Sequence, residues 1–170
     1  MPSAAELRSM TPDDFTAVID LARSLPQWFN QEGIQQITVD IEHQPGAVAI
    51  VNGDVIGFIT WTFAGDGSGE IGWIAVDSGH HRGGLGRRLL LFAEDWLQGS
   101  GVIDLFVETL GDSIDYEPYE RTRAFYRAVG FREFKRVKTD NPGMPESLTL
   151  RKTLTPSEPP PPHSWRFLAR

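Results

Sequence analysis

Three glycines crowd into four positions directly ahead of a glycine-free, partly apolar run. The segment from residue 80 to residue 96 reads HHRGGLGRRLLLFAEDW, with glycines at 83, 84 and 86 and arginines at 82, 87 and 88. If the run is a helix, its first backbone N–H groups carry a positive partial charge. Glycines would let a phosphate approach these donors without a Cβ in the way. The pattern therefore indicates an anion site that suits a pyrophosphate, with a flexible lead into a core helix as the alternative.

Other sites that use glycines, histidines or a serine nucleophile do not fit the sequence. No Gly-x-x-x-x-Gly-Lys-Ser/Thr motif occurs, and Arg87, Arg88 and Leu89 follow Gly86 where the dinucleotide fingerprint needs another glycine. The adjacent His80 and His81 lack a cysteine or HExxH partner, so we expect no metal. No Gly-x-Ser-x-Gly elbow is present either.

The glycine loop is expected to lie inside a β-loop-α-β unit. Leu85, Leu89, Phe92 and Trp96 recur at the spacing of one apolar helix stripe, and Gly99 and Gly101 mark the end of that helix. Apolar runs at Glu70–Val76 and Ile103–Val107 predict a strand before and after it. A helix between two strands makes the crossover that a parallel pair needs.

The remaining elements surround this unit. Asn52-Gly53 is a strong hairpin signal between two apolar runs, so we expect an antiparallel meander that ends with Glu70–Val76. The further predicted strands are Leu7–Met10, Ala47–Val51, Val55–Phe63, Phe131–Lys138 and Ser147–Leu154, and the further helices run from Thr11 to about Leu25, from Gln31 to Glu42 and from about Glu117 to Val129. The fold class is therefore α/β in the α+β sense, with a mixed sheet.

Bulk composition narrows the classes of function. The chain has 170 residues, no cysteine and a net charge of -7. One domain is the default at this length, a reducing compartment fits the lack of cysteine, and the acidic balance argues against nucleic acid. No signal peptide or membrane span of about 20 apolar residues is visible, so we expect a cytoplasmic protein without a membrane partner. The composition divides the chain into a domain, residues 1–154, and a Pro-rich tail, residues 155–170.

Two segments together resemble the GCN5-related N-acetyltransferase (GNAT) family. IGWIAVDSGHHRGGLGRRLLLFAEDWL, from Ile71 to Leu97, resembles the central motif of that family, and TRAFYRAVGF, from Thr122 to Phe131, resembles its second motif. The order of predicted elements agrees over Glu6 to Leu154. The resemblance implies the acyl-CoA N-acyltransferase fold: a mostly antiparallel sheet of six to seven strands, helices on both faces and the central β-loop-α-β unit.

The resemblance also implies how a donor would bind. Acetyl-CoA would be the cosubstrate, without a metal, and its pantetheine arm would lie between two parallel strands that splay apart. Backbone groups of Ile74, Ala75 and Val76 would pair with the arm. The pyrophosphate would lie on the loop of His81, Arg82, Gly83, Gly84, Leu85, Gly86 and Arg87. His81 stands where the family usually has Gln or Arg, so binding is expected to be weaker or dependent on pH.

The catalytic roles follow from the same likeness. Tyr126 matches the family's tyrosine that protonates the leaving thiolate, although on spacing alone it reads as a core residue. Glu70 lies at the offset of the basic glutamate found in histone-acetylating members; Glu108 is the reserve, or water serves as the base. The reaction would be N-acetylation of a primary amine.

The acceptor side is less defined by sequence. An amine on a small molecule, a protein or a peptide fits, and Tyr119 stands where the family often has Asn. Residues expected to line the acceptor pocket or attract a cation are Trp28, Phe29, Trp61, Trp73, Tyr119, Asp115, Glu117 and Glu120. Three alternatives stay open: an acyl-CoA-binding regulatory protein with little turnover, another acyl group, and another acceptor. Family members often dimerise, so a homodimer stays open too.

Overall fold

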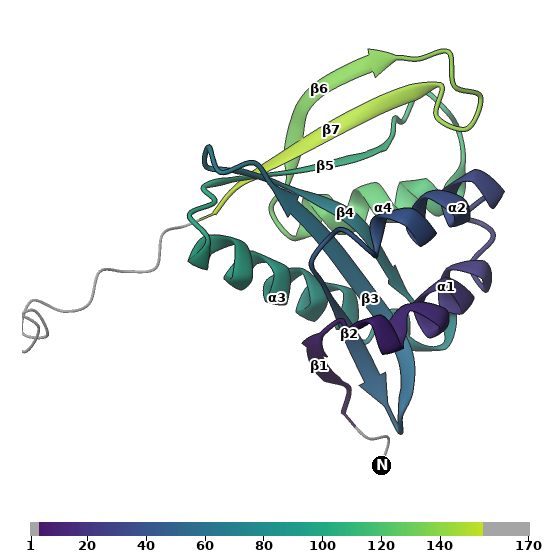
Figure 1. Ribbon diagram of the computed structural model, residues 1–170. Coiled ribbons are helices and arrows are strands. Elements are labelled where there is room, and N and C mark those ends of the chain that lie inside the picture. Colours follow the sequence, from purple (N-terminus) through teal and green to yellow (C-terminus); the bar gives the residue numbers. More distant parts are fainter. Residues whose placement is uncertain (1–3, 155–170) are drawn as a thin grey trace, which may run out of the picture.

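A seven-stranded sheet in the order β1-β2-β3-β4-β5-β7-β6 organises the chain. The structure, a computed structural model, describes residues 4–154, and the predicted tail at 155–170 lies outside them. The strands are β1 (Glu6–Ser9), β2 (Gly46–Val51), β3 (Asp54–Phe63), β4 (Ser68–Val76), β5 (Asp104–Leu110), β6 (Arg132–Lys138) and β7 (Glu146–Thr153). The helices are α1 (Phe15–Arg23), α2 (Gln31–Asp40), α3 (Leu85–Gly99) and α4 (Glu117–Ala128), with short 3-10 turns η1 (Pro12–Asp14) and η2 (Ser78–His80). Figure 1 traces this order.

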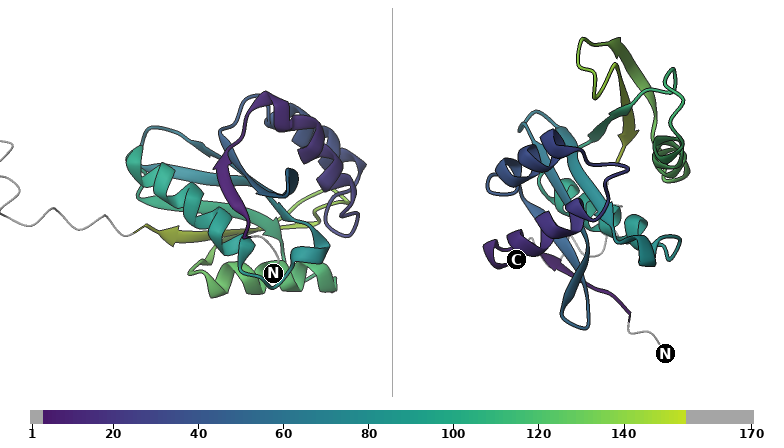
Figure 2. Two further views of the ribbon diagram at one scale, coloured as in Figure 1. Left: turned by 90° about the horizontal axis from the view of Figure 1, so that it is seen from below. Right: turned by 90° about the vertical axis from the view of Figure 1, so that its right-hand side faces the viewer.

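Helices cover both faces of the sheet, as predicted. One buried cluster joins α1 and α2 to β2, β3 and β4 through residues such as Val18, Ile37 and Phe58. The other joins α3 and α4 to the opposite face through residues such as Leu89 and Tyr126. Figure 2 shows α3 across the sheet from α1 and α2. No helix in residues 4–154 is long and apolar enough to cross a membrane.

The antiparallel meander is confirmed. β1, β2, β3 and β4 pair antiparallel in sequence. Asn52 and Gly53 both have positive φ, 51° and 83°, which matches the backbone twist that a two-residue hairpin requires.

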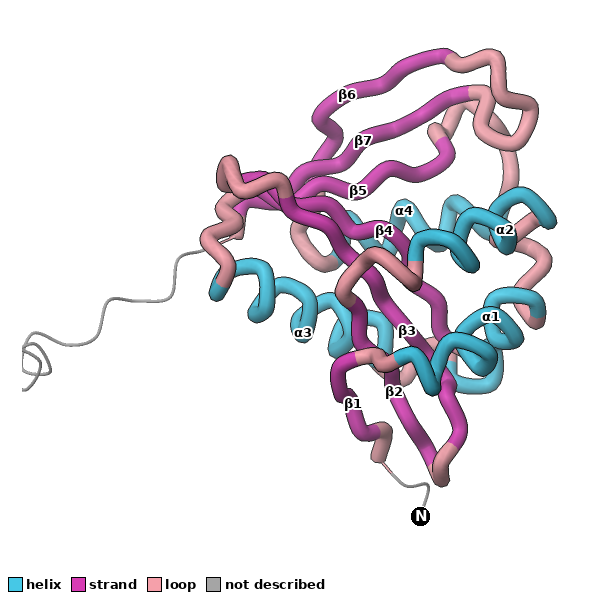
Figure 3. Tube along the Cα trace, viewed as in Figure 1, coloured by secondary structure: helices cyan, strands magenta, loops and turns pink. Residues whose placement is uncertain are grey.

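The parallel pair β4 and β5 separates part-way along its length. Pairing runs from Ser68 with Asp104 to Ile71 with Val107 and then stops, although both strands continue. At this point the β3–β4 register shifts between Ile59 and Trp61, and the Trp73 N–H donates to the Thr60 hydroxyl at 3.0 Å. The bulge bends β4 while β5 stays paired with β7 along its whole length. Figure 3 shows β5, β7 and β6 diverging from β3 and β4.

Element ends differ from the predictions where tertiary contacts decide them. The first helix begins as the turn η1, in which the Asp14 carboxylate accepts from the Thr11 N–H at 2.8 Å and pairs with Arg8 at 2.7 Å. β5 continues past the predicted Val107 to Leu110 because β7 pairs with it as far as Ser147. The part of β5 beyond Val107 includes polar residues, so a search of the sequence for apolar runs does not detect it.

Candidate functional site

A cavity of about 560 Å³ lies where β4 and β5 separate. Six parts of the chain form its wall: β4, β5, the glycine loop, α4, the segment between α1 and α2, and the turn between β6 and β7. The lining residues are Leu25, Trp28, Phe29, Gly72, Trp73, Ile74, Ala75, Val76, His80, His81, Arg82, Gly84, Leu85, Gly86, Arg87, Val107, Glu108, Thr109, Tyr119, Arg121, Thr122, Phe125, Tyr126, Ala128, Val129 and Met144. A volume of this size suits a small-molecule site.

The edge of β4 that faces the cavity has no strand partner beyond Ile71. The N–H groups of Trp73 and Asp77 point toward β3, at 3.0 Å from the Thr60 hydroxyl and 2.8 Å from the Ile56 carbonyl. Polar groups alternate along a strand, so Ile74 and Val76 direct theirs toward β5, across the cavity. Ala75 directs its own toward β3 and contributes only its surface to the wall. Two of the three predicted β4 residues therefore present backbone donors and acceptors.

The glycine loop leads into α3 as predicted. Gly84 is the N-cap with φ 77°, a left-handed conformation that favours glycine. The first bond of the helix runs from the Arg88 N–H to the Gly84 carbonyl at 3.1 Å. The N–H groups of Leu85, Gly86 and Arg87 come before that bond and therefore have no partner within the helix.

Not every loop residue faces the cavity. Gly83 is exposed and lies outside the lining residues. The Arg88 guanidinium, predicted to add charge to the anion site, instead donates to the Ala5 carbonyl at 2.8 Å. Arg82, with φ 68°, and Arg87 both line the wall and supply the positive charge there.

His81 turns its ring into the space between the strands. Its Nε2 lies 2.7 Å from the Val76 carbonyl oxygen, so this nitrogen carries the proton and donates. The ring also meets Trp28 edge-on, with centroids 5.8 Å apart. The Val76 carbonyl on the unpaired edge of β4 is therefore already bonded to His81, and contact of this ring with a phosphate stays a prediction.

Tyr126 brings a hydroxyl to the cavity from α4. The residue is only 4% exposed, and Phe125 and Phe131 flank its ring at centroid distances of 5.3 and 5.5 Å. Burial, and to a lesser extent Tyr119, raises the pKa of Tyr126 well above the ordinary tyrosine value. The phenol therefore stays protonated at neutral pH and offers a proton to the cavity.

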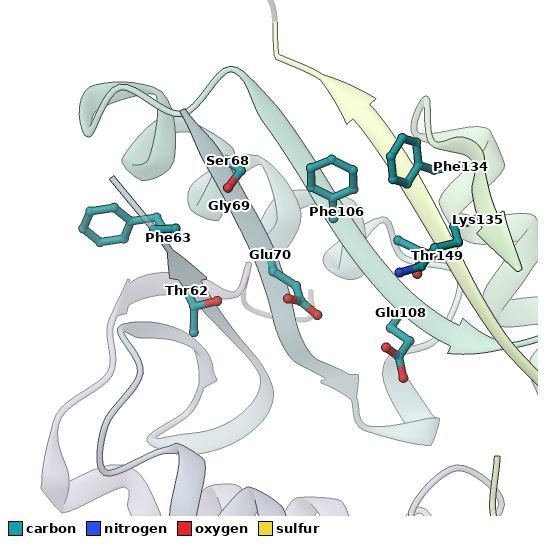
Figure 4. A pocket seen from close by; sticks show the side chains of 11 residues that line it. Thr62, Phe63, Ser68, Gly69, Glu70, Phe106, Glu108, Phe134, Lys135 and Thr149 are labelled. Atoms are coloured by element: carbon teal, nitrogen blue, oxygen red, sulfur yellow. The ribbon is translucent and has the colours of Figure 1, made fainter. Parts of the chain in front are cut away.

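Glu70 and Glu108 lie together beside the cavity. Both line an outer groove of about 400 Å³, and Figure 4 shows their carboxylates extending in the same direction from β4 and β5. Glu108 lines the cavity as well, whereas Glu70 does not. Burial and the nearby charge of Glu108 raise the pKa of Glu70 above its ordinary value. Glu108 is therefore the carboxylate that lines both the groove and the cavity. From the sequence it was only the reserve candidate for the base.

The predicted acceptor residues divide into two groups. Trp28, Phe29, Trp73 and Tyr119 line the cavity. The prediction for Trp61 is wrong, because this residue is 1% exposed and belongs to the buried cluster on the α3 side of the sheet. Its ring packs against Trp96 of α3, with ring centroids 5.5 Å apart. The three predicted carboxylates, Asp115, Glu117 and Glu120, also lie outside the lining residues.

Hydrogen bonds tie the segment between α1 and α2 to α4. Trp28 Nε1 donates to the Pro118 carbonyl and the Thr122 hydroxyl, each at 3.1 Å. In return, the Tyr119 hydroxyl donates to the Trp28 carbonyl at 2.9 Å. The cavity walls on both sides of the gap are therefore held in place without a ligand.

Several lining residues had no signal in the sequence. Leu25 ends an apolar helix stripe, Met144 lies in a turn, and Arg121 reads as a solvated helix residue. Only the pairing of strands far apart in the chain brings them to one wall. Within residues 4–154, no group of three or more His, Asp or Glu residues is placed to hold a metal ion.

Thr109 lines the cavity, and its substitution tests the hydrogen bonding of the cavity wall through protein stability, without a ligand. Its hydroxyl is buried and has no hydrogen-bond partner among the described residues. Thr109→Val keeps the shape and removes the unpaired group, so we expect the free energy of unfolding to rise by about 1 kcal/mol in urea titrations.

Thr60→Val is the matched control for this substitution. The Thr60 hydroxyl is equally buried but accepts from the Trp73 N–H, so its loss should lower the free energy of unfolding by about 1–3 kcal/mol. A loss of stability in Thr109→Val as large as that in Thr60→Val would show that the Thr109 hydroxyl is bonded.

Comparisons with known proteins agree with this geometry. The family model described as "Acetyltransferase (GNAT) family" matches residues 15–131. A search of curated protein sequences finds no match.

Solved structures share the fold. A protein assigned to the GNAT acetyltransferases, from Desulfovibrio desulfuricans, superposes with a TM-score of 0.78 and 26% identity over 89% of this chain and 100% of that one. The ribosomal-protein-S18-alanine N-acetyltransferase from Escherichia coli gives 0.73 and 20% over 90% and 96% of the two chains. An aminoglycoside 6'-N-acetyltransferase complexed with coenzyme A gives 0.70 and 16% over 91% and 99%. At such low identities the last two establish likeness of fold and not of substrate.

Proposed function

The chain belongs to the GNAT acetyltransferase family, whose model covers more than half of its length, and we propose that it is an N-acetyltransferase that moves an acetyl group from acetyl-CoA to a primary amine by direct attack. One observation carries this function. A single cavity joins the unpaired edge of β4, the N-terminus of α3 and the buried hydroxyl of Tyr126. These are the three parts that binding an acyl-CoA and releasing its thiol require.

The donor would be held mainly by backbone groups. Ile74 and Val76 present donors and acceptors to an extended arm, as a strand edge does to an added strand. The first-turn N–H groups of α3 suit a pyrophosphate, and Arg82 and Arg87 add charge next to them. His81 would yield the Val76 carbonyl to the arm or share it, because a carbonyl oxygen has two acceptor positions.

Two proton transfers accompany the reaction. An alkylamine is mostly protonated at neutral pH, since its reference pKa is about 10.4, so a base must free its lone pair. We assign this role to Glu70, whose raised pKa strengthens it as a base. Because Glu70 lies beside the cavity and Glu108 lines it, Glu70 would take the proton through a water next to Glu108, with Glu108 itself or a water alone as the reserve. As the nitrogen bonds to the acyl carbon and the carbon–sulfur bond breaks, Tyr126 would give its proton to the departing sulfur.

Finer features of this function are proposals as well. The acceptor is an amine on a small molecule, a protein or a peptide, and nucleic acid and membranes are not partners. The protein acts in the cytoplasm, where it is either a monomer or a homodimer. The presence of His81, where the family usually has Gln or Arg, leaves room for a second candidate, an acyl-CoA-binding regulatory protein with little turnover. Release of free thiol from acetyl-CoA in the presence of amines separates the two.

Tyr126→Phe tests the acid. We expect kcat to fall about 100-fold or more with little change in the KM for acetyl-CoA, because the substitution removes only the hydroxyl. Initial rates of thiol release at saturating substrates measure the effect. An unchanged kcat would remove Tyr126 from this role.

Glu108→Gln tests the base through its pH dependence. A base acts when deprotonated, so kcat/KM should fall as the pH drops through the pKa of Glu70. Burial and the charge of Glu108 hold that pKa high; loss of the charge should therefore move the acidic limb to lower pH. The exposed Asp115→Asn should leave the limb in place. Loss of kcat at saturating amine in Glu108→Gln would instead make Glu108 the base, whereas a raised KM for the amine alone would not.

Gly84→Val tests the anion loop. A β-branched residue is strained at φ 77° and puts a side chain at the N-terminus of α3, so calorimetry should show loss of acetyl-CoA binding. Gly101→Val is the matched control, because Gly101 also has a positive φ, 87°, and open space around its Cβ position, but lies outside the lining residues. Equal affinities of the two variants for acetyl-CoA would count against the glycine loop as the binding site of the pyrophosphate.

A further inference from the structure

The part of the cavity beyond the donor-binding groups has an apolar wall. Leu25, Trp28, Phe29, Trp73 and Met144 form it, from the segment between α1 and α2, from β4 and from the turn between β6 and β7. None of these residues belongs to the glycine loop or to α3, at which the phosphates would bind, and Trp28 borders that loop through the His81 ring. The acceptor must therefore meet the acyl group among these side chains.

Both indole rings in this wall have their polar ends engaged elsewhere. Trp73 Nε1 donates to the Asp40 carboxylate at 2.8 Å, and Trp28 Nε1 donates to α4. The rings therefore offer only carbon to the cavity. Phe29 lies against Trp73, with centroids 6.1 Å apart, and extends the same apolar surface.

The charges in the wall suit one cation and not several. Glu108 is the one carboxylate among the lining residues, while Arg82, Arg87 and Arg121 are cations. Two further carboxylates near this wall are engaged, Asp40 by Trp73 and Glu117 by Arg121 at 2.9 Å. The donor's phosphates would engage Arg82 and Arg87, and Glu108 is then the one lining carboxylate left for an acceptor. The further ammonium groups of a polyamine would have no carboxylate partner in this wall.

Resting on the proposed function, we infer that the acceptor is a small primary amine that carries a single positive charge beside an apolar or aromatic group. The ammonium approaches Glu108, and the apolar group packs against Phe29, Trp73 and Met144. The cavity of about 560 Å³ must hold this amine together with the donor's arm, and hydrogen bonds fix its walls, so a small molecule fits better than a chain.

Substrate profiling tests the inference directly. The purified full chain would be assayed for thiol release from acetyl-CoA with 2-phenylethylamine, spermidine, kanamycin and a peptide with N-terminal phenylalanine. We expect kcat/KM for 2-phenylethylamine to exceed the other three by at least about 10-fold, a factor that differential apolar contact can supply. A higher kcat/KM for spermidine, kanamycin or the peptide would overturn the inference and leave the proposed function intact.

Failure of the proposed function would look different. Acetyl-CoA would bind by calorimetry, yet no amine would be acetylated, and the inference would fall with it.

Two variants locate the acceptor in this part of the cavity. Phe29→Ala should raise the KM for 2-phenylethylamine about 10-fold and leave the KM for acetyl-CoA unchanged, while Leu91→Ala, on the exposed surface of α3, should change neither. Met144→Glu adds a second carboxylate in a turn and should shift the preference toward spermidine. A Phe29→Ala enzyme with an unchanged KM for the amine, or a Met144→Glu enzyme with an unchanged preference, would overturn the placement.

Discussion

The end of pairing between β4 and β5 is the constraint on which the rest of the site depends. After Ile71 and Val107 the two strands no longer bond to each other, so a sheet that is otherwise continuous opens at its centre. The bulge opposite Thr60 bends β4, and the full-length pairing of β5 with β7 keeps β5 beside β7. The opening exposes backbone on β4, and the residues that cover it from both faces become the walls of a site.

The site is asymmetric because its walls come from different parts of the chain. Toward α3, main-chain groups and arginines dominate, which is chemistry for an anion and an extended polar arm. Toward the segment between α1 and α2, aromatic carbon dominates, with Glu108 as the carboxylate of the wall. Trp28 links the two regions, since its ring meets His81 and its polar groups bond to α4. A hydrogen-bonded frame of this kind limits how far the walls must reorganise when substrates bind.

Local patterns in the sequence predicted the elements well. The hairpin at Asn52-Gly53, the stripe of α3 and the glycine loop each depend on residues close in the chain, and all three lie where they were expected. Strand separation has no such signature, because it follows from the register between strands far apart. The same reason explains why Leu25, Met144 and the shared position of Glu108 were missed. Trp61 was assigned to the wrong side because both faces of β3 are apolar, and alternation alone does not tell which face a given tryptophan takes.

The unpaired edge of β4 could pair with strands of other chains, and neighbouring residues limit access to it. Beyond Ile71, β4 is an edge strand in the middle of the molecule, and free edges invite pairing with other chains. The His81 ring bonds to one carbonyl of that edge, and Trp28, with its bonds to α4, lies across it. A second protein strand, which brings side chains on both faces, has little room to enter. The features that position a ligand therefore also cover part of the exposed edge, and they leave it open chiefly to a narrow, extended molecule.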